Sequence, residues 1–168
     1  MIFIFLRIFM SACFILALAA CGFQPLYGTQ SAKTVTAQFD RIKIANIPDR
    51  EGQILRNLLI DWLYQNGVPT DPAYTLSFDP VKERITDLDI TKSADATRAQ
   101  LRLDTTMKLS DQAGTVLLER PLMAITSYNK LQSHFTTRVS ENAARESALG
   151  ELARKAETQL ALYFERVP

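Results

Sequence analysis

The feature that most constrains the fold is a strict alternation of side chains between Gln100 and Leu109. One alternating set is Leu101, Leu103, Thr105, Met107 and Leu109, and the other is Gln100, Arg102, Asp104, Thr106 and Lys108. Because successive side chains of a strand point to opposite faces, this pattern predicts a strand with one face buried and one in water. The turn residues 111–114 separate it from a second strand pattern at about 115–128, so the two should form a hairpin. Pro121 cannot donate to a ladder, which places it at a sheet edge or at a bulge.

Two further strand patterns lie upstream of this hairpin. Ile42 and Ile44 alternate with two cations, Arg41 and Lys43, which predicts a short first strand. Residues 74–78 alternate again, and after Pro80 the apolar residues change from even to odd positions and back. We therefore expect the second strand to continue to about residue 90 through a bulge or a bend.

Two segments show the period of a helix. Asp49 is placed to cap the first, and Asn66-Gly67 closes it. Its apolar stripe is Ile54, Leu55, Leu58, Leu59, Trp62 and Leu63, which favours core packing over ligand stacking for the tryptophan. The second helix is expected after a polar link at 129–139, with Ser140 as its N-cap and a stripe from Leu149 to Val167.

The order of these elements predicts an α+β fold. Two helices with one apolar face each, together with four strands, indicate a two-layer sandwich in which both helices pack on one face of a four-stranded, mostly antiparallel sheet. The order along the chain is β-α-β-β-β-α.

The charges are balanced, with 19 Lys+Arg against 18 Asp+Glu. No global field attracts nucleic acid, so an anionic ligand must meet a local cluster of cations. Three pairs could bind lipid phosphates through charge-assisted hydrogen bonds: Arg41 with Lys43, Arg102 with Lys108, and Lys92 with Arg98 beside a turn. A solvated sheet face with Asp89 and Asp104 interspersed explains the same pattern.

The motifs of common enzymes are missing from the sequence. His134 is the only histidine, which favours a surface or capping role over a zinc site or a catalytic triad. Asp87 and Asp89 would lie about 7 Å apart on one strand face. That separation fits a lipid-anchored hydrolase, but a solvated strand face explains it with no further assumption. The prediction is a protein that is not an enzyme and needs no cofactor or metal.

Residues 1–20 form an apolar stretch that ends in small residues, which is typical of a cleavable secretory signal. Uncleaved, the stretch would approach the ~20 apolar residues that span a membrane. Arg7 breaks the run, and Gly22 and Pro25 follow it at once, which favours cleavage over a permanent anchor. Removing 20 of 168 residues would leave 148, the size of one ordinary domain.

The residues around Cys21 resemble the lipobox of bacterial lipoproteins, with Leu18-Ala19-Ala20 before the cysteine and Gly22 after it. The resemblance implies cleavage before Cys21, a thioether from its sulfur to diacylglycerol, and three acyl chains, which anchor far better than one. The only other cysteine, Cys13, lies in the leader, so the mature chain has no internal disulfide. The predicted organisation is a signal peptide at 1–20, a lipidated tether at 21–34 and a single α+β domain at 35–168.

The segment from Leu18 to Gly28, LAACGFQPLYG, resembles the start of the mature chain in the lipopolysaccharide-assembly lipoprotein family, LptE. Members commonly begin with Cys-Gly-Phe-x-Pro-Leu-Tyr, which stands here at residues 21–27. A looser likeness extends over the mature region, with a tether, a strand and helix, three strands and an Ala-rich terminal helix. The resemblance implies a lipoprotein that plugs the outer-membrane β-barrel of the LPS translocon, assists assembly of that barrel and aids LPS insertion into the outer leaflet.

The partners implied by this resemblance are the translocon barrel, lipopolysaccharide, and a membrane reached through the N-terminal lipid. Gly22, and not Asp, follows Cys21, which favours delivery to the outer membrane, with the body facing the periplasm or inside a barrel lumen. Only Cys21 carries over residue by residue, whereas Lys92 and Arg98 are candidates for LPS phosphates from their turn position alone. The alternative is a periplasmic lipoprotein that serves as an accessory subunit of another lipid transport system.

Overall fold

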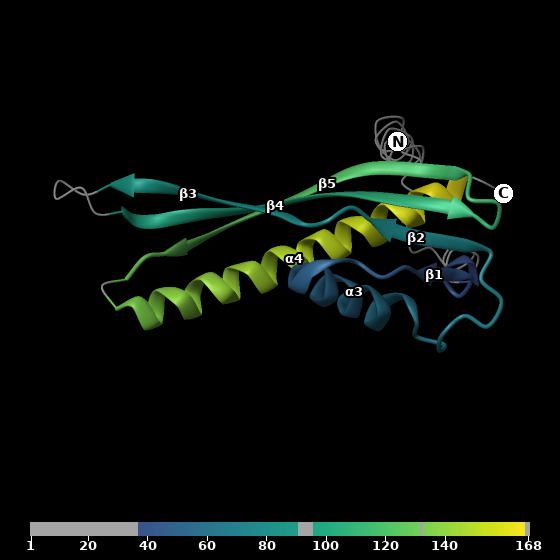
Figure 1. Ribbon diagram of the computed structural model, residues 1–168, viewed down its shortest axis with the longest axis horizontal. Coiled ribbons are helices and arrows are strands. Elements are labelled where there is room, and N and C mark those ends of the chain that lie inside the picture. Colours follow the sequence, from purple (N-terminus) through teal and green to yellow (C-terminus); the bar gives the residue numbers. More distant parts are fainter. Residues whose placement is uncertain (1–36, 91–95, 132, 167–168) are drawn as a thin grey trace, which may run out of the picture. The chain divides into compact units, whose positions relative to one another are not determined.

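The computed structural model describes residues 37–90, 96–131 and 133–166. In chain order the elements are β1 (Ile42–Ile44), α3 (Asp49–Leu63), β2 (Tyr74–Phe78), β3 (Lys82–Ile90), β4 (Ala96–Asp111), β5 (Val116–Asn129) and α4 (His134–Arg166) (Figure 1). The α+β class and the mostly antiparallel sheet are confirmed. The sheet has five strands and not four.

The strand β4 is the centre of the sheet. One of its edges pairs with β5 over almost its whole length, and the other pairs first with β3 and then with β2, both antiparallel. On this second edge Lys82 of β3 lies opposite Asp104, and Phe78 of β2 lies opposite Met107. Strand β1 extends the sheet in parallel with β2.

The break between β2 and β3 corrects the prediction of one strand with a bulge or bend. Pro80, which has no N–H to donate, lies at the break. On its N-terminal side the N–H of Asp79 donates to the oxygen of Thr106 (3.0 Å), and the hydroxyl of Thr105 donates to the oxygen of Asp79 (2.7 Å). The segment between β2 and β3 therefore stays bonded to β4, although the regular strand is interrupted there.

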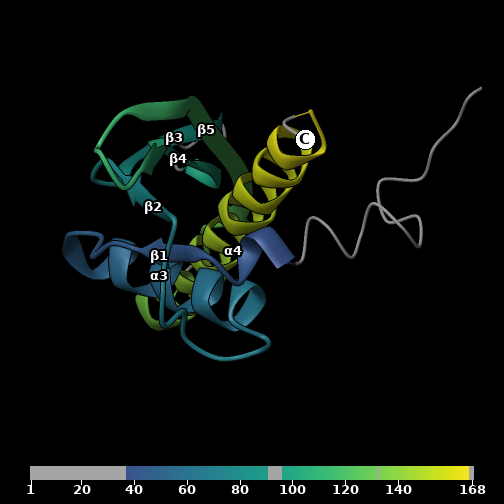
Figure 2. The same ribbon diagram turned by 90° about the vertical axis from the view of Figure 1, so that its right-hand side faces the viewer.

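Helix α4 crosses one face of the sheet, and α3 lies beside it (Figures 1 and 2). The core lies between these two layers. Its fully buried large side chains are Ile42, Ile47, Leu55, Leu59, Leu76, Leu101, Leu103, Met107, Leu109, Leu149, Leu152 and Leu160. Each buried side chain of this size contributes roughly 1.5–3 kcal/mol of transfer free energy. In α3 the buried stripe is Leu55, Leu59 and Leu63, and Trp62 is only half-buried.

The start of α3 differs from the prediction that Asp49 caps it. Pro48 occupies the N-cap position without a side-chain hydrogen bond, and Asp49 is the first helical residue, with φ of 67°. Asp is among the residues that tolerate this left-handed region best. Gly52 packs so closely on Ile47 that a Cβ would lie 2.7 Å from its Cγ2 atom. A tight approach of the backbone, and not a side-chain cap, therefore fixes this end.

The helix α4 begins at His134, six residues before the predicted N-cap Ser140, so the polar link predicted at 129–139 is wrong beyond residue 133. The first turn is held by local bonds: the N–H of Thr137 donates to the oxygen of Ser133 (3.1 Å). The buried stripe begins only at Ala148. The first fourteen helical residues thus have no buried face that a hydrophobic period could reveal.

The predicted hairpin is confirmed. Gly114 adopts φ of 84°, and its N–H donates to the oxygen of Asp111 (3.1 Å), which closes the turn between β4 and β5. Pro121 of β5 lies opposite Thr106 of β4. The second edge of β5 has no strand partner among the described residues. Of the two places predicted for this proline, the sheet edge is the right one.

Across the described ranges, no helix combines the length and the apolarity that crossing a membrane requires.

Candidate binding face of the sheet

The two faces of β4 have opposite characters. Leu101, Leu103 and Met107 point toward the helices and are fully buried. The alternating residues Arg102 and Asp104 lie on the other face and are partly exposed. The predicted separation of this strand into a buried and a solvated face is confirmed.

The strand β3 separates its charges by sign in the same way. Lys82 and Arg84 lie opposite Asp104 and Arg102 of β4, on the face away from the helices. Glu83, the residue between the two cations, lies opposite the buried Leu103 and therefore faces the helix side. Consecutive residues of alternating sign thus put cations on one face of the sheet and a carboxylate on the other.

The carboxylates on the helix side are neutralised by cations of other elements. The guanidinium of Arg145 in α4 binds Glu83 through Nε (2.6 Å) and Nη2 (2.9 Å), and it also binds Glu141 (2.7 Å). The hydrogen bonds to Glu83 raise the pKa of Arg145 above its ordinary value. The ammonium of Lys130 binds Asp87 at 2.8 Å, which raises the pKa of Lys130. Each of these two carboxylates of β3 therefore has a cationic partner on the helix side, and Arg145 is shared with Glu141.

The solvent side has an excess of cations. Arg102 holds Asp104 through two short hydrogen bonds, Nε to Oδ2 and Nη2 to Oδ1, both 2.8 Å. The bonds from Arg102 lower the pKa of Asp104, so this carboxylate stays charged and compensates one cation. Lys82 and Arg84 are exposed and form no ion pair within 4.0 Å in the part of the chain that the structure describes.

Arg98 extends this cluster toward the end of β4. The register between β4 and β5 runs without a shift from Arg98 to Leu109, so Arg98 lies on the same face as Arg102 and is exposed. We call Lys82, Arg84, Arg98 and Arg102 the basic face. Lys108 lies on the same side of β4 but is bound to Asp79 (3.1 Å) and Glu119 (3.7 Å), of which Asp79 contributes most to raising its pKa.

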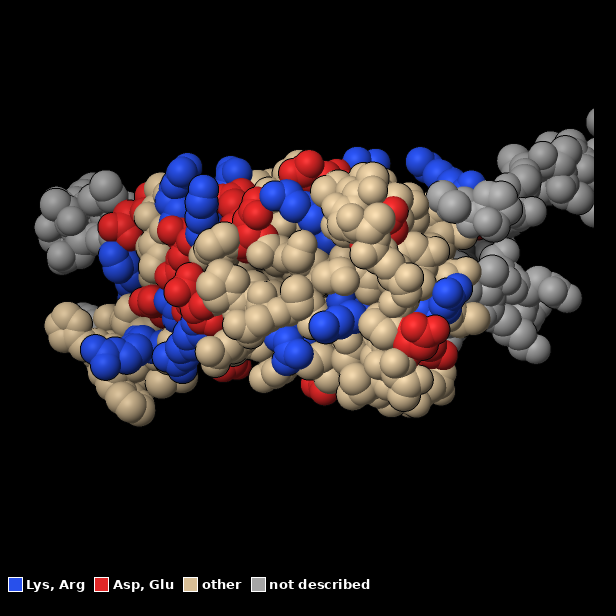
Figure 3. Space-filling model, turned by 45° about the vertical axis from the view of Figure 1, so that its right-hand side comes forward, with Lys and Arg blue, Asp and Glu red and all other residues tan. Residues whose placement is uncertain are grey.

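Apolar side chains of β5 border the basic face. Met123 lies opposite Asp104 and is 39% exposed, and Ile125 lies opposite Arg102 and is 40% exposed. A surface hollow of about 380 Å³ is lined by both cations and carboxylates, among them Lys82, Arg102, Asp79 and Asp104, and by apolar residues that include Met123. Seen from one side of the domain, charged side chains of both signs gather over one end, and the middle is largely uncharged (Figure 3). Cations next to exposed apolar groups fit a ligand that is both anionic and amphiphilic.

The residues predicted for function are only partly within the described structure. Cys21 and Lys92 lie outside the described residues, so lipidation and the Lys92 contact remain predictions. Arg98 belongs to β4 itself and not to the turn beside it. Sequence reasoning missed Lys82 and Arg84, although the run Lys-Glu-Arg carries the signal once residues 82–84 are placed in a regular strand.

The carboxylates considered for a hydrolase do not form the expected pair on a regular strand. The register shifts between Asp87 and Asp89, which interrupts the alternation on which the separation of about 7 Å depended. Asp87 is bound to Lys130 (2.8 Å). His134 is exposed at the first residue of α4. Among the described residues no three His, Cys, Asp or Glu side chains are grouped to hold a metal ion.

The structure thus defines the chain as an α+β sandwich domain with an open sheet face that carries cations and exposed apolar side chains. The model of the LptE family, described as lipopolysaccharide-assembly, matches residues 39–162 of the chain. This match spans most of the described domain, and the chain belongs to the LptE family.

Solved structures of bacterial lipoproteins share the fold. A lipoprotein from Caulobacter crescentus CB15 has a TM-score of 0.62 and 21% identity, over 80% of this chain and 97% of the other. A minor lipoprotein from Acinetobacter baumannii has a TM-score of 0.60 and 22% identity, over 73% and 91% of the two chains. The rare lipoprotein B from Shewanella oneidensis has a TM-score of 0.57 and 9% identity, over 72% and 92%. A comparison with curated proteins gave no match.

Membership of the family establishes the general role of the chain. The chain has a role in lipopolysaccharide assembly, and its family is one of non-enzymatic accessory lipoproteins. The predicted family resemblance is thereby confirmed.

Proposed function

We propose that this protein is an outer-membrane lipoprotein, anchored through Cys21, that plugs the β-barrel of the LPS translocon and assists its assembly. In this position its basic face contacts the phosphates of lipopolysaccharide and aids insertion into the outer leaflet. The separation of charge on β3 is the observation that carries the second part of this proposal. It turns a chain with net charge +1 into a domain with a locally basic sheet face.

The chemistry of lipopolysaccharide matches this face. Its phosphates are anionic, and they bind guanidinium and ammonium groups through charge-assisted hydrogen bonds. Its acyl chains are apolar, as are the exposed Met123 and Ile125 beside the cations. Since Lys82 and Arg84 have no ion-pair partner in the described part of the chain, a phosphate can bind them without first displacing a carboxylate.

The test is binding of purified lipopolysaccharide to the full chain and to its Lys82→Glu/Arg84→Glu variant. We expect the double variant to bind at least about tenfold more weakly, because a single charge-assisted bond is worth about 1.5–3 kcal/mol and about 1.4 kcal/mol is a factor of ten. The matched control is Arg41→Glu/Lys43→Glu, which reverses two exposed cations flanking and within β1. Equal loss in both double variants would mean that only net charge matters and would contradict a site on the basic face.

The barrel part of the proposal is tested by purification. The full chain, extracted in mild detergent from cells that make the LPS translocon, should carry the barrel protein with it. Recovery of the chain alone after cross-linking would contradict the plug. Recovery with an inner-membrane transporter would instead support the role in another lipid transport system.

A further inference from the structure

The outer edge of β5 is protected against pairing with another strand along one part and is open along another. In an antiparallel ladder, alternate residues direct their N–H and C=O groups toward the neighbouring strand, and the residues between direct theirs away from it. The N–H of Lys130 donates to the oxygen of Thr97, next to the end of β4 (2.9 Å). Even-numbered residues of β5 therefore bond β4, and odd-numbered residues direct their backbone groups outward.

The outward groups from Glu119 to Met123 are blocked. The oxygen of Glu119 accepts a hydrogen bond from Nη1 of Arg120 (2.9 Å), and the oxygen of Met123 accepts one from Nζ of Lys155 in α4 (2.6 Å). Pro121, between them, has no N–H. Prolines and long cationic side chains are the means by which native proteins prevent unwanted pairing at sheet edges.

The other long edge of the sheet is protected at one end, the C-terminal end of β3. Strand β3 shows two shifts of register against β4, between Asp87 and Asp89 and between Asp89 and Ile90. Irregularities of this kind twist an edge away from a regular partner. These features therefore protect the C-terminal end of β3 and the middle of β5.

The segment from Ile125 to Asn129 has none of these protecting features. Ile125, Ser127 and Asn129 are exposed, and no hydrogen bond to the outward backbone groups of Ile125 or Ser127 is formed by described residues. The register with β4 is regular throughout this segment, so its outward N–H and C=O groups have the spacing of a strand ready to pair.

We propose that the open edge, Ile125–Asn129, pairs with an extended segment of the translocon barrel protein, which adds a strand to this sheet. This inference rests on the proposed function, because it names the contact through which the plug holds its barrel. The added segment places an apolar side chain beside the exposed Ile125. Main-chain bonds give such a contact affinity, and alternate side chains give it specificity.

A second copy of the chain is the less favourable occupant. Antiparallel pairing of two β5 edges would join the two sheets into one and set both basic faces on the same side of it. Each copy would bring Lys82 and Arg84 without an ion-pair partner in the described part of the chain, so the pairing would add like charges to one surface. A segment of a different protein avoids this repulsion.

The test variant is Ser127→Pro in the full chain, co-produced with the barrel protein. Proline at this odd position removes an outward N–H and keeps the β4 ladder, as Pro121 already does six residues earlier in β5. We expect the variant to capture about tenfold less barrel, while it binds lipopolysaccharide as the original chain does. The matched control, Ser127→Ala, keeps the N–H and should capture a normal amount.

Amide exchange gives a second readout that does not depend on the variant folding. In the complex, the amides of Ile125 and Ser127 should become protected, whereas those of Thr126 and Tyr128 are protected already in the free chain. Normal capture by Ser127→Pro, unchanged exchange at Ile125 and Ser127, or loss of self-association in place of barrel capture would each overturn the inference. If the original chain captures no barrel, the proposed function itself fails, which is a different result.

Discussion

The two faces of this sheet are made by the same strands and serve different ends. On β4, Leu103 is fully buried against the helix layer, whereas its neighbour Arg102 lies on the solvent side, bound to Asp104. On β3, Glu83 is tied to Arg145 of α4, whereas its neighbours Lys82 and Arg84 are exposed. Neighbouring residues of one strand thus lie on opposite faces, one of which stabilises the domain while the other is open to a ligand.

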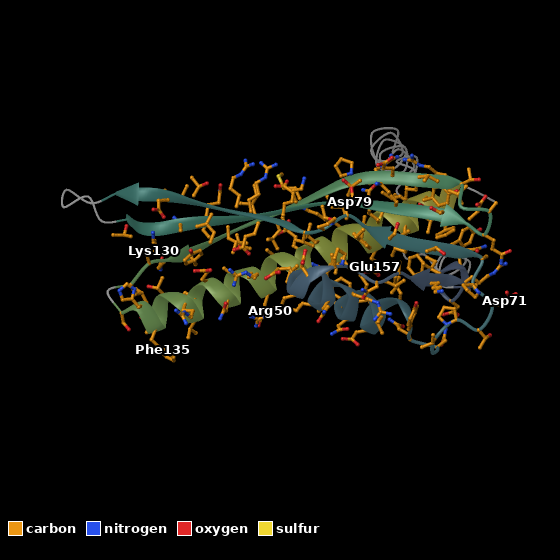
Figure 4. All side chains as sticks on the ribbon, viewed as in Figure 1. Arg50, Asp71, Asp79, Lys130, Phe135 and Glu157 are labelled. Carbon is orange, nitrogen blue, oxygen red and sulfur yellow. The ribbon has the colours of Figure 1, made fainter. Side chains whose placement is uncertain are left out.

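The same division runs along α4. All of its buried residues lie from Ala148 onward, and its first part exposes Phe135 (76%) and Val139 (53%). Figure 4 shows Phe135 at the start of the helix, pointing away from the sheet. A helix of 33 residues therefore secures the core with its second half only. The comparison shows that residues of the same helix or strand have different roles: the buried ones stabilise the domain, and the exposed ones form its surface.

The largest effect is expected from the core side of β4. Leu103→Ala should lower the free energy of unfolding by roughly 2–5 kcal/mol, because the side chain is fully buried and leaves a cavity. Gln100→Ala, on the solvent side of the same strand, should change it by less than about 0.5 kcal/mol. Urea unfolding measures both values, and similar losses would break the distinction between the faces.

A smaller effect is expected where α4 holds the helix side of β3. Arg145→Met should destabilise the fold by roughly 1–3 kcal/mol, because Glu83 and Glu141 keep their charges without their partner. Adding Glu83→Gln to this variant should recover part of the loss. A Lys130→Met control, which breaks a more exposed pair, should lose less stability. If the double variant is no more stable than Arg145→Met, the ion pair is not the cause.

The smallest effect is a pH dependence on the solvent side. The pKa of Asp104 is below its ordinary value of 3.8 in the folded chain, chiefly through the hydrogen bonds from Arg102. A carboxylate with a lowered pKa contributes stability above its ordinary pKa, and this contribution is lost as the pH falls through the lowered pKa. The stability difference between the original chain and Asp104→Asn should be constant above about pH 5 and shrink in more acidic solution. An equal trend for Asp71→Asn, at an exposed loop position, would refute the assignment.

Most of the fold could be predicted from hydrophobic period and turn residues. The alternation at 100–109 and the stripe from Leu149 to Phe164 each bury one face and so leave a pattern in the sequence, and the turn residues Asp111–Gly114 mark the hairpin. The start of α4 and the break at Pro80 could not be predicted in this way. The first has no buried face, and the second depends on how both β2 and β3 share one edge of β4.

The basic face was harder to predict than the fold. The four cations come from two strands, and only the register of β3 on β4 puts Arg84 opposite Arg102 and Lys82 on the same face. Sequence reasoning selected Arg98 because it was thought to lie at a turn, and it is instead a strand residue. Alternating charges along one strand predict a basic face only when the neighbouring strand and its register are known.

The central claim is that this chain serves lipopolysaccharide assembly by supporting the translocon barrel. The most direct measurement is to deplete the chain from the cells that make it and to follow the amount of mature barrel and of lipopolysaccharide at the cell surface. We predict that both fall together and that the full chain restores both. Normal barrel maturation and normal surface lipopolysaccharide in depleted cells would contradict the claim.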